Sequence, residues 1–475
     1  MKIVFTSIFR PGLGGGAGRV AHEIARYCSL KHDVVMICPA DQTKLYQDEH
    51  GLHIYGIRSA GDTEFQIPDL SARTVRDLFG FLDDFQPDIV HAHDPALMGL
   101  IGQVWARMNL VPFVHTAHVL PSKAMDFGTN EAINVPLLKS SISVHAIQGI
   151  LSNFYYNCDA LIALNQSALD SIRDFGFTGL VYIVPNGRAL AHYSGCQYAN
   201  IESELKTLAF IGFLNKRKNQ AYLLKVLREL PENYKLRLAG KPLKQEYKDK
   251  LQDYINKYDL GNVEFVGQIT HDEIPEFLEK AHIFTSASIM EVQSLVVIEA
   301  LASGTPVVGL SNETIDELVN DEVGAWIQKD QKPADFAQQI ERICDLPPAE
   351  YELMCQTARD SVAHLDWSHV IELTVSAYED LQNIQPTISD DESDMLTSLV
   401  TFIAMGDVRD YLLEVIDGTR QRLTHEANLL PRMKVPSLIR PWIRVPSSTW
   451  ILSGLTILVS AIGYLFMRQQ GKNKD

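Results

Sequence analysis

The fold is decided first by residues 2–38, KIVFTSIFRPGLGGGAGRVAHEIARYCSLKHDVVMIC. Lys2 to Ser7 is a short apolar run typical of a buried strand, and Arg19 to Tyr27 has the apolar spacing of a helix. His32 to Cys38 is a second apolar run, so the stretch predicts a right-handed unit of strand, helix and parallel strand. Between the first strand and the helix, Arg10 to Arg19 form a glycine-rich loop whose backbone N–H groups could approach a phosphate.

The same alternation of strands and helices continues along the chain and divides into two series. The predicted strands are Asp88–His93, Pro112–His115, Ala160–Ala163 and Leu180–Val184 in the first series, and Leu208–Gly212, Lys235–Ala239, Val263–Val266, Ile283–Ser286 and Pro306–Gly309 in the second. A polar stretch at 197–206 separates them. We therefore predict an α/β protein with two doubly wound Rossmann-like domains, residues 1–197 and 198–366. The two sheets are expected to face a cleft, where ligands bind beyond the carboxyl ends of the strands.

The C-terminal part predicts an appendage and a membrane anchor. Residues 385–448 begin as a polar, acidic linker and continue with the apolar spacing of a helix. Residues 449–467 contain no charged residue and are near the lower length limit for spanning the hydrocarbon core of a bilayer. They predict one transmembrane helix, with a buried core helix as the alternative. Residues 468–475 form a basic tail.

Composition and histidine spacing exclude two kinds of partner. The net charge of −17, from 42 Lys and Arg against 59 Asp and Glu, opposes the field of a polyanion, so we expect no nucleic acid partner. His91 and His93 form a His-x-His pair at the end of a strand, but no further ligands follow at a matching spacing, and we predict no metal site. His115 and His118 also suit structural histidines that are hydrogen-bonded in a core.

The strongest pattern is residues 288–309, SIMEVQSLVVIEALASGTPVVG, in which Glu291 precedes and Glu299 lies within a helix predicted to begin near Ser294. Ionised carboxylates accept strong hydrogen bonds from the neighbouring hydroxyls of a sugar or a ribose. The helix start favours a diphosphate. Lys218, in the segment IGFLNKRKNQ, follows a strand and a turn and can neutralise such a diphosphate. The pattern predicts a site for a nucleotide sugar.

One alternative uses the glycine-rich loop differently. Read as Gly12-x-Gly14-x-x-Ala17, with Asp41 after the second strand, the loop imitates the fingerprint of a dinucleotide-binding domain. An NAD-dependent enzyme is therefore the first rival interpretation.

In combination, these motifs resemble glycosyltransferase family 4, the retaining GT-B enzymes, over residues 1–384. The matching residues, in the family's order, are Gly14 to Gly16, DIVHAHD at 88–94, Thr116 with His118, VPNG at 184–187, Glu291 with Glu299, and Trp367 with Tyr378. The resemblance implies a GT-B fold with a helix at 367–384 that crosses back to the N-terminal domain. It also implies transfer of a hexose from a UDP- or GDP-sugar with retained configuration and without a further cofactor.

The resemblance assigns roles to single residues. The catalytic positions are His118, over the donor sugar near the reacting carbon, Glu291, which would hold sugar hydroxyls, and Lys218, which would bind the diphosphate. Glu299 would bind the ribose. Gly15 and Gly16 would contact the donor phosphate, and Ser294 and Leu295 would present backbone N–H groups to the phosphates. The loop after Gly267 would lie near the base, and Arg217 is a further donor-binding position.

Two departures from the family bear on activity and on the acceptor. Phe213 stands where the family usually has Arg, and Arg217 is a candidate substitute for that diphosphate contact. The run Glu291-Val-Gln-Ser is closer to the E-T-Q-G run of some diacylglycerol glucosyltransferases than to the common E-G-F-G run, which favours a lipid acceptor. Apolar residues between His118 and Asp159 could admit a lipid tail, and ordinary helix packing explains them equally well.

The expected localisation combines these inferences. Nucleotide sugars are cytosolic and no signal peptide precedes the first strand, so we expect cytoplasmic catalytic domains with residues 449–467 as a single-pass C-terminal anchor. Two alternatives from other classes are a transferase acting on a soluble sugar or a protein, and a non-catalytic sugar-nucleotide-binding protein.

Overall fold

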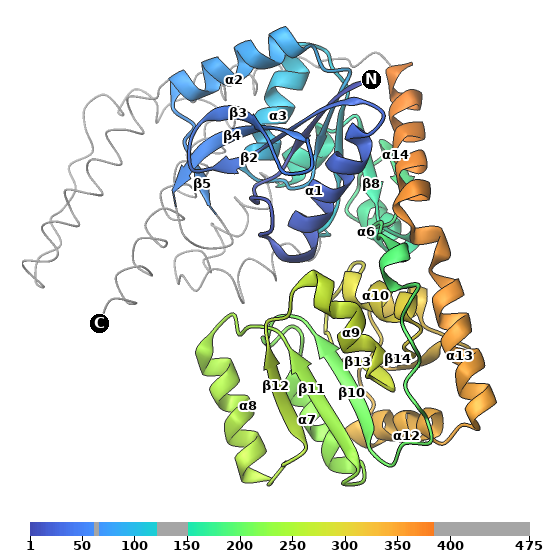
Figure 1. The fold of residues 1–475 in the computed structure, drawn as a ribbon. Helices are drawn as coiled ribbons and strands as arrows, with labels where there is room; N and C mark the ends of the chain where they lie inside the picture. Colours follow the sequence, from blue (N-terminus) through green and yellow to red (C-terminus); the bar gives the residue numbers. More distant parts are fainter. Residues whose placement is uncertain (61–65, 121–150, 384–475) are drawn as a thin grey trace, which may run out of the picture. The chain divides into compact units, whose positions relative to one another are not determined.

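The computed structural model describes residues 1–60, 66–120 and 151–383, which form two compact units (Figure 1). Of these described residues, the first unit holds those of Met1–Ala163 and Leu169–Tyr182 together with 375–383, and the second holds Leu164–Ala168 and Ile183–Thr374. Residues 183–197, which the sequence analysis places in the N-terminal domain, pack with the second unit, because Tyr193 and Cys196 are buried in its core.

The first unit is built on a nine-stranded sheet in the order β3-β4-β2-β1-β6-β7-β8-β9, with β5 paired to β4. Its strands are β1 (Lys2–Thr6), β2 (Asp33–Ala40), β3 (Lys44–Gln47), β4 (His53–Ala60), β5 (Ile67–Pro68), β6 (Ile89–Ala92), β7 (Phe113–Thr116), β8 (Ala160–Ala163) and β9 (Leu180–Ile183). Its helices are α1 (Gly15–Ser29), α2 (Ala72–Phe85), α3 (Leu97–Met108) and α6 (Gln166–Asp174). The strands from β4 through β1 to β8 pair in parallel, whereas β3 and β5 run antiparallel to β4. The sequence predicts all of these strands except β3, β4 and β5.

The strand order of the first unit reverses between β1 and β6. From β1 the chain moves outward through β2 to β4, and from β6 it moves outward the other way through β7 to β9. The glycine-rich loop follows β1, and the end of DIVHAHD follows β6. In open α/β sheets, ligands bind beyond the carboxyl ends of the strands at such a reversal.

The second unit has a six-stranded, all-parallel sheet in the order β12-β11-β10-β13-β14-β15. Its strands are β10 (Lys206–Ile211), β11 (Tyr234–Ala239), β12 (Val263–Gly267), β13 (Ile283–Ser286), β14 (Val307–Leu310) and β15 (Gly324–Ile327). Its helices are α7 (Gln220–Glu229), α8 (Gln245–Lys257), α9 (Ile274–Glu279), α10 (Leu295–Ser303), α11 (Glu313–Leu318), α12 (Pro333–Cys344) and α13 (Pro348–Ser361), and α14 (Trp367–Gln382) contributes to both units. This is the doubly wound order with its reversal between β10 and β13. The predicted pair of Rossmann-like domains is confirmed, and only β15 is missed in this unit.

Two hydrophobic cores cover the two faces of the six-stranded sheet. One is formed with α7, α8 and α12, and the other with α9 and α10. Helix α10 is buried on nearly every side, which explains why its sequence LVVIEALAS is apolar all round. Glu299 is the one charged residue of α10 and has no exposed surface, so its charge requires a partner inside the protein.

The prediction of a membrane localisation is corrected. Among the described residues, no helix combines the length and the apolar character needed to cross a membrane. The predicted segments 385–448, 449–467 and 468–475 lie outside the described residues, as does most of the apolar stretch that follows His118. We do not retain the single-pass anchor.

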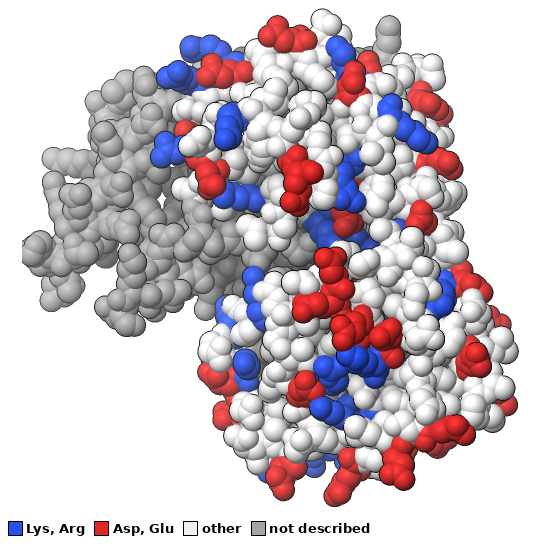
Figure 2. All heavy atoms as spheres, in the orientation of Figure 1, with Lys and Arg blue, Asp and Glu red and all other residues white. Residues whose placement is uncertain are grey.

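Charged side chains of both signs are intermixed on the face of the described residues that Figure 2 shows. Figure 2 shows basic and acidic groups side by side on the visible face of each unit. On this face the acidic excess of the sequence is therefore distributed and does not form one broad field of a single sign.

Candidate functional site

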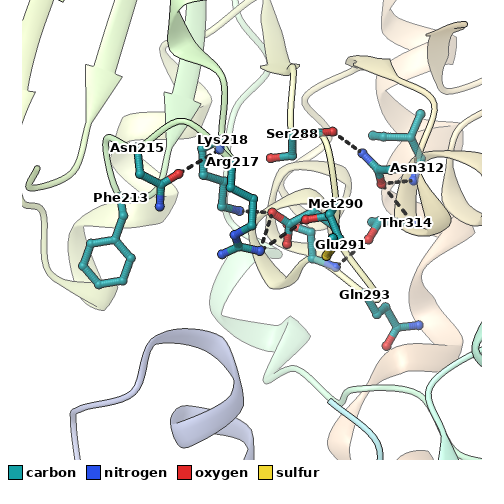
Figure 3. A network of polar contacts seen from close by, with 12 residues as sticks. Phe213, Asn215, Arg217, Lys218, Ser288, Met290, Glu291, Gln293, Asn312 and Thr314 are labelled. Atoms are coloured by element: carbon teal, nitrogen blue, oxygen red, sulfur yellow. Dashed lines mark hydrogen bonds and ion pairs between the residues drawn. The ribbon is translucent and has the colours of Figure 1, made fainter. Parts of the chain in front are cut away.

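Two cationic side chains meet a carboxylate at the reversal point of the second unit. The loop after β10 carries Arg217 and Lys218, and the loop after the adjacent β13 carries Glu291. Lys218 Nζ lies 2.5 Å from Glu291 Oε1, and Arg217 Nη1 lies 3.5 Å from the same oxygen. Figure 3 shows both cationic side chains pointing toward the carboxylate. The structure thus brings together three residues that the sequence analysis singled out in separate motifs.

The charges of this cluster determine the protonation state of Glu291. Burial raises the pKa of Glu291, but the charges of Lys218 and Arg217, with hydrogen bonds from Lys218 and Ser288, outweigh burial and lower the pKa below its ordinary value. Glu291 is therefore ionised at neutral pH. The side chains of Lys218 and Glu291 each remain 11% exposed, so a ligand can reach both.

The loop between β13 and α10 is held along its whole length. Its hydrogen bonds are Asn312 Nδ2 to Ser288 O (3.0 Å), Arg217 Nη1 to Met290 O (3.2 Å), Asn186 N to Gln293 Oε1 (2.6 Å) and Ser294 N to Thr314 Oγ1 (2.8 Å). Figure 3 shows Asn312 and Thr314 on one side of the loop and the cations on the other. Because the hydrogen-bond partners come from three separate segments, around Asn186, Arg217 and 312–314, the position of Glu291 is fixed before any ligand binds.

The start of α10 offers fewer backbone donors than the resemblance implies. Ser294 is the N-cap of the helix, and its N–H donates to Thr314 Oγ1 within the protein. Leu295 is the first helical residue, so the positive end of the helix dipole lies at the end of the Glu291 loop. Of the two predicted donor-binding positions, Ser294 therefore has no backbone N–H left for a phosphate, because this group already donates to Thr314.

Glu299 is part of a buried ion pair that the sequence analysis did not predict. Arg188 Nε lies 3.2 Å from Glu299 Oε1, and the two side chains are 1% and 0% exposed. His271 Nδ1, from the segment after Gly267, lies 3.9 Å from the same oxygen. Arg188 directly follows the VPNG motif, and this position is the signal that could have drawn attention to it. Gly267 ends β12 with a φ of 86° and is exposed.

Phe213, which stands where the family usually has Arg, lies in the same region. Figure 3 shows the ring of Phe213 directed away from the pair formed by Lys218 and Glu291. Lys241 Nζ lies 5.6 Å from the centre of this ring. Arg217 supplies the guanidinium beside Glu291.

In the first unit, the glycine-rich loop leads into α1. Gly14 is the N-cap of α1 with a φ of 85°, and a Cβ there would lie 2.2 Å from Phe9 Cγ, so only glycine fits. Gly15 and Gly16 follow as exposed residues in the first turn of this 15-residue helix. Their backbone N–H groups are open to an anion at the reversal point of the first unit.

The histidines of the first unit form two hydrogen-bonded groups. His91 joins Tyr378 Oη through Nδ1 (2.6 Å) and Thr116 Oγ1 through Nε2 (2.7 Å). His93 Nδ1 lies 2.9 Å from His118 Nε2, with the two rings stacked. Burial lowers the pKa of His118 to about 4, and burial followed by the neighbouring histidines lowers the pKa of His93 well below its ordinary value. Both rings are therefore neutral at physiological pH.

Two doubly wound, parallel-sheet units are the architecture of GT-B glycosyltransferases, and the family models and solved structures that the chain matches are of this class. Residues 14–192 match the family model described as Glycosyltransferase Family 4, and residues 197–360 match that of Glycosyl transferases group 1. The chain belongs to glycosyltransferase family 4.

Similar proteins act on different molecules. The chain is 28% identical over 254 residues to the alpha-monoglucosyldiacylglycerol synthase of Streptococcus pneumoniae, covering 50% of this chain and only 55% of that enzyme. It is 26% identical over 308 residues to the D-inositol 3-phosphate glycosyltransferase of Mycolicibacterium vanbaalenii, covering 61% of this chain and 66% of that enzyme. The Anabaena protein HepE, solved in complex with UDP-glucose, has the same fold at 18% identity, with a TM-score of 0.62 over 80% of this chain and 100% of that protein.

Proposed function

We propose that this protein transfers a hexose from a UDP- or GDP-hexose to a hydroxyl group of a diacylglycerol-type lipid, with retained configuration and without a metal ion. The observation that carries the proposal is the cluster of Arg217, Lys218 and Glu291 at the reversal point of the second unit. It combines positive charge for a diphosphate with a carboxylate for sugar hydroxyls. Two observations support the donor class, namely the family and the UDP-glucose bound to a protein of the same fold.

The chemistry follows from these side chains. The bond between the anomeric carbon and the phosphate oxygen breaks, and the electron pair leaves with the nucleoside diphosphate. Lys218, Arg217 and the N-terminus of α10 stabilise the negative charge that develops on this leaving group. Glu291 accepts hydrogen bonds from sugar hydroxyls and keeps the hexose oriented. The oxygen of the acceptor hydroxyl forms the new glycosidic bond on the face from which the diphosphate leaves, and the proton of that hydroxyl passes to the departing phosphate oxygen.

The lipid acceptor is supported by sequence. The run Glu291-Val-Gln-Ser resembles that of diacylglycerol glucosyltransferases, and the synthase from Streptococcus pneumoniae is a relative. A soluble acceptor is the second candidate, since the mycobacterial relative is named for D-inositol 3-phosphate.

The test is release of nucleoside diphosphate by the full chain from a panel of UDP- and GDP-hexoses in the presence of EDTA. Detergent-dispersed diacylglycerol and D-inositol 3-phosphate serve as the two acceptors, and the anomeric configuration of the product is read by NMR. Lys218→Met is expected to abolish most turnover. Lys250→Met, at an exposed lysine paired with Glu246, is the matched control and is expected to retain it.

Each outcome decides one part of the proposal. Turnover that requires the lipid supports it, and turnover only with D-inositol 3-phosphate replaces the lipid acceptor with a soluble one. Activity that EDTA abolishes would contradict the metal-free mechanism. Donor binding without turnover on either acceptor or on a wider panel would refute the enzymatic function.

A further inference from the structure

The contact between His93 and His118 links a buried strand end to the residue assigned to the donor sugar. His93 directly follows β6, and His118 follows the neighbouring β7. The 2.9 Å distance between His93 Nδ1 and His118 Nε2 is a hydrogen bond, so one of these nitrogens carries a proton and the other does not. His93 is 4% exposed, whereas His118 is only partly buried. The interior ring can therefore control the tautomer of the accessible ring.

The direction of this hydrogen bond follows from the other nitrogen of His93. His93 Nε2 is buried and has no hydrogen-bond partner among the described residues. A buried N–H without a partner is rarer and more destabilising than a bare acceptor. The proton of neutral His93 therefore resides on Nδ1, where it is donated to His118 Nε2.

His115, on the adjacent strand β7, shows the same arrangement with an unambiguous partner. Its Nδ1 lies 3.0 Å from the carbonyl oxygen of Ala92, which can only accept, so Nδ1 carries the proton. Its Nε2 is also buried without a partner among the described residues. This second ring demonstrates that the same core accommodates a bare Nε2.

We propose that His93 is a positioning residue, which holds His118 in the tautomer with its proton on Nδ1, so that His118 donates an N–H to an oxygen of the donor sugar. The donor role of His118 rests on the proposed function, whereas the tautomer does not. Because His118 Nε2 accepts from His93, the proton of a neutral His118 must lie on Nδ1. Without His93, the two tautomers of His118 would compete, and the ring could also rotate.

The first test reads the tautomer without any substrate. Nitrogen chemical shifts of the full chain labelled with ¹⁵N-histidine distinguish protonated from bare ring nitrogens, and the signals of His118 are assigned by their loss in His118→Asn. We expect His118 with a protonated Nδ1 and a bare Nε2 at neutral pH. A protonated Nε2 in His118 would overturn the proposal whether or not the protein is a glycosyltransferase.

The second test measures turnover of the nucleotide sugar. His93→Phe keeps a ring of similar size but removes the donor, and kcat is expected to fall roughly 10- to 100-fold with a much smaller change in KM for the donor. His93→Asn retains an N–H near the position of Nδ1 and is expected to restore most of kcat. His115→Asn is the matched control, since it changes an equally buried histidine that has no hydrogen bond to His118.

These variants separate positioning from structural damage and from a wrong function. A wild-type kcat in His93→Phe, or an equal loss in His115→Asn at unchanged thermal stability, would overturn the positioning role. If His93→Phe does not fold, the kcat of His93→Asn and the nitrogen chemical shifts of the wild type still test the positioning role. Absence of turnover in the wild type would instead refute the proposed function, and the tautomer would remain measurable.

Discussion

Removing one partner of the Arg188–Glu299 pair is expected to destabilise the second unit much more than removing both. The charges lie 3.2 Å apart, and the side chains are 1% and 0% exposed. Glu299→Leu leaves the Arg188 guanidinium buried without its carboxylate, and Arg188→Met leaves the carboxylate of Glu299 buried without its nearest cation. Each single variant should lower the free energy of unfolding by about 3–5 kcal/mol. The double variant replaces both charges with apolar groups and should lie within about 1 kcal/mol of the wild type or above it.

The assay is urea unfolding of the full chain, followed by tryptophan fluorescence and far-ultraviolet circular dichroism, with the four proteins forming a double-mutant cycle. Lys280→Met is the control, because its pair with Glu276 is exposed and should contribute at most about 1 kcal/mol. Single variants that cost less than about 1 kcal/mol, or a double variant whose loss equals the sum of the singles, would refute the reasoning. The result also bears on function, because activity lost in Glu299→Leu could reflect unfolding alone.

Three further predictions concern other parts of the structure. Lys218→Met is expected to lower kcat about 10²- to 10³-fold, because one preorganised charge at the leaving group is lost, and steady-state kinetics with an unchanged kcat would contradict this. Gly187→Ala places a Cβ 2.2 Å from Trp367 Cε3 and should destabilise the protein by about 1–3 kcal/mol in thermal unfolding, whereas an unchanged melting temperature would show that the ring can move. Burial lowers the pKa of His115 to about 3 from 6.5, so this group disfavours the folded state increasingly as pH falls below 6.5, by up to about 5 kcal/mol near pH 3. His115→Asn should reduce the slope of stability against pH between 4 and 6.5, and an unaltered slope would contradict the assignment.

Two strands were predictable with their bounds because they are buried on both faces. The strands β8 and β13 are continuous apolar runs whose residues are all buried, and the sequence indicates them with the bounds that the structure has. Two of the missed strands have weaker patterns. The strand β3 is a sheet edge with mostly exposed side chains, and β15 is an edge strand that exposes Trp326. Their pairing depends on neighbouring strands more than on their own residues.

Residues of the candidate site were predictable only where a single short segment of sequence contains the whole pattern that identifies them. Glu291 and the start of α10 lie within a single motif, and Lys218 lies in a short basic turn. Arg188 pairs with a residue far along the chain, so its burial follows from the fold and not from its neighbours in sequence. The contact between His93 and His118 was hidden for a similar reason, because each histidine alone is typical of a hydrogen-bonded core residue.

The two carboxylates of the same motif have different electrostatic tasks, and their burial explains the difference. Glu299 lies in the middle of α10, in the core, where its charge is matched by Arg188 whether or not a ligand is bound. Glu291 lies in the loop before the helix, where its partner Lys218 is partly exposed and can also bind a phosphate. Under the proposed function, a diphosphate that attracts Lys218 weakens the ion pair between Lys218 and Glu291. The carboxylate oxygens of Glu291 then become available to the sugar hydroxyls. Recognition of the two halves of the donor is therefore coupled through Lys218, and a nucleoside diphosphate and a free hexose are expected to bind more tightly together than either does alone.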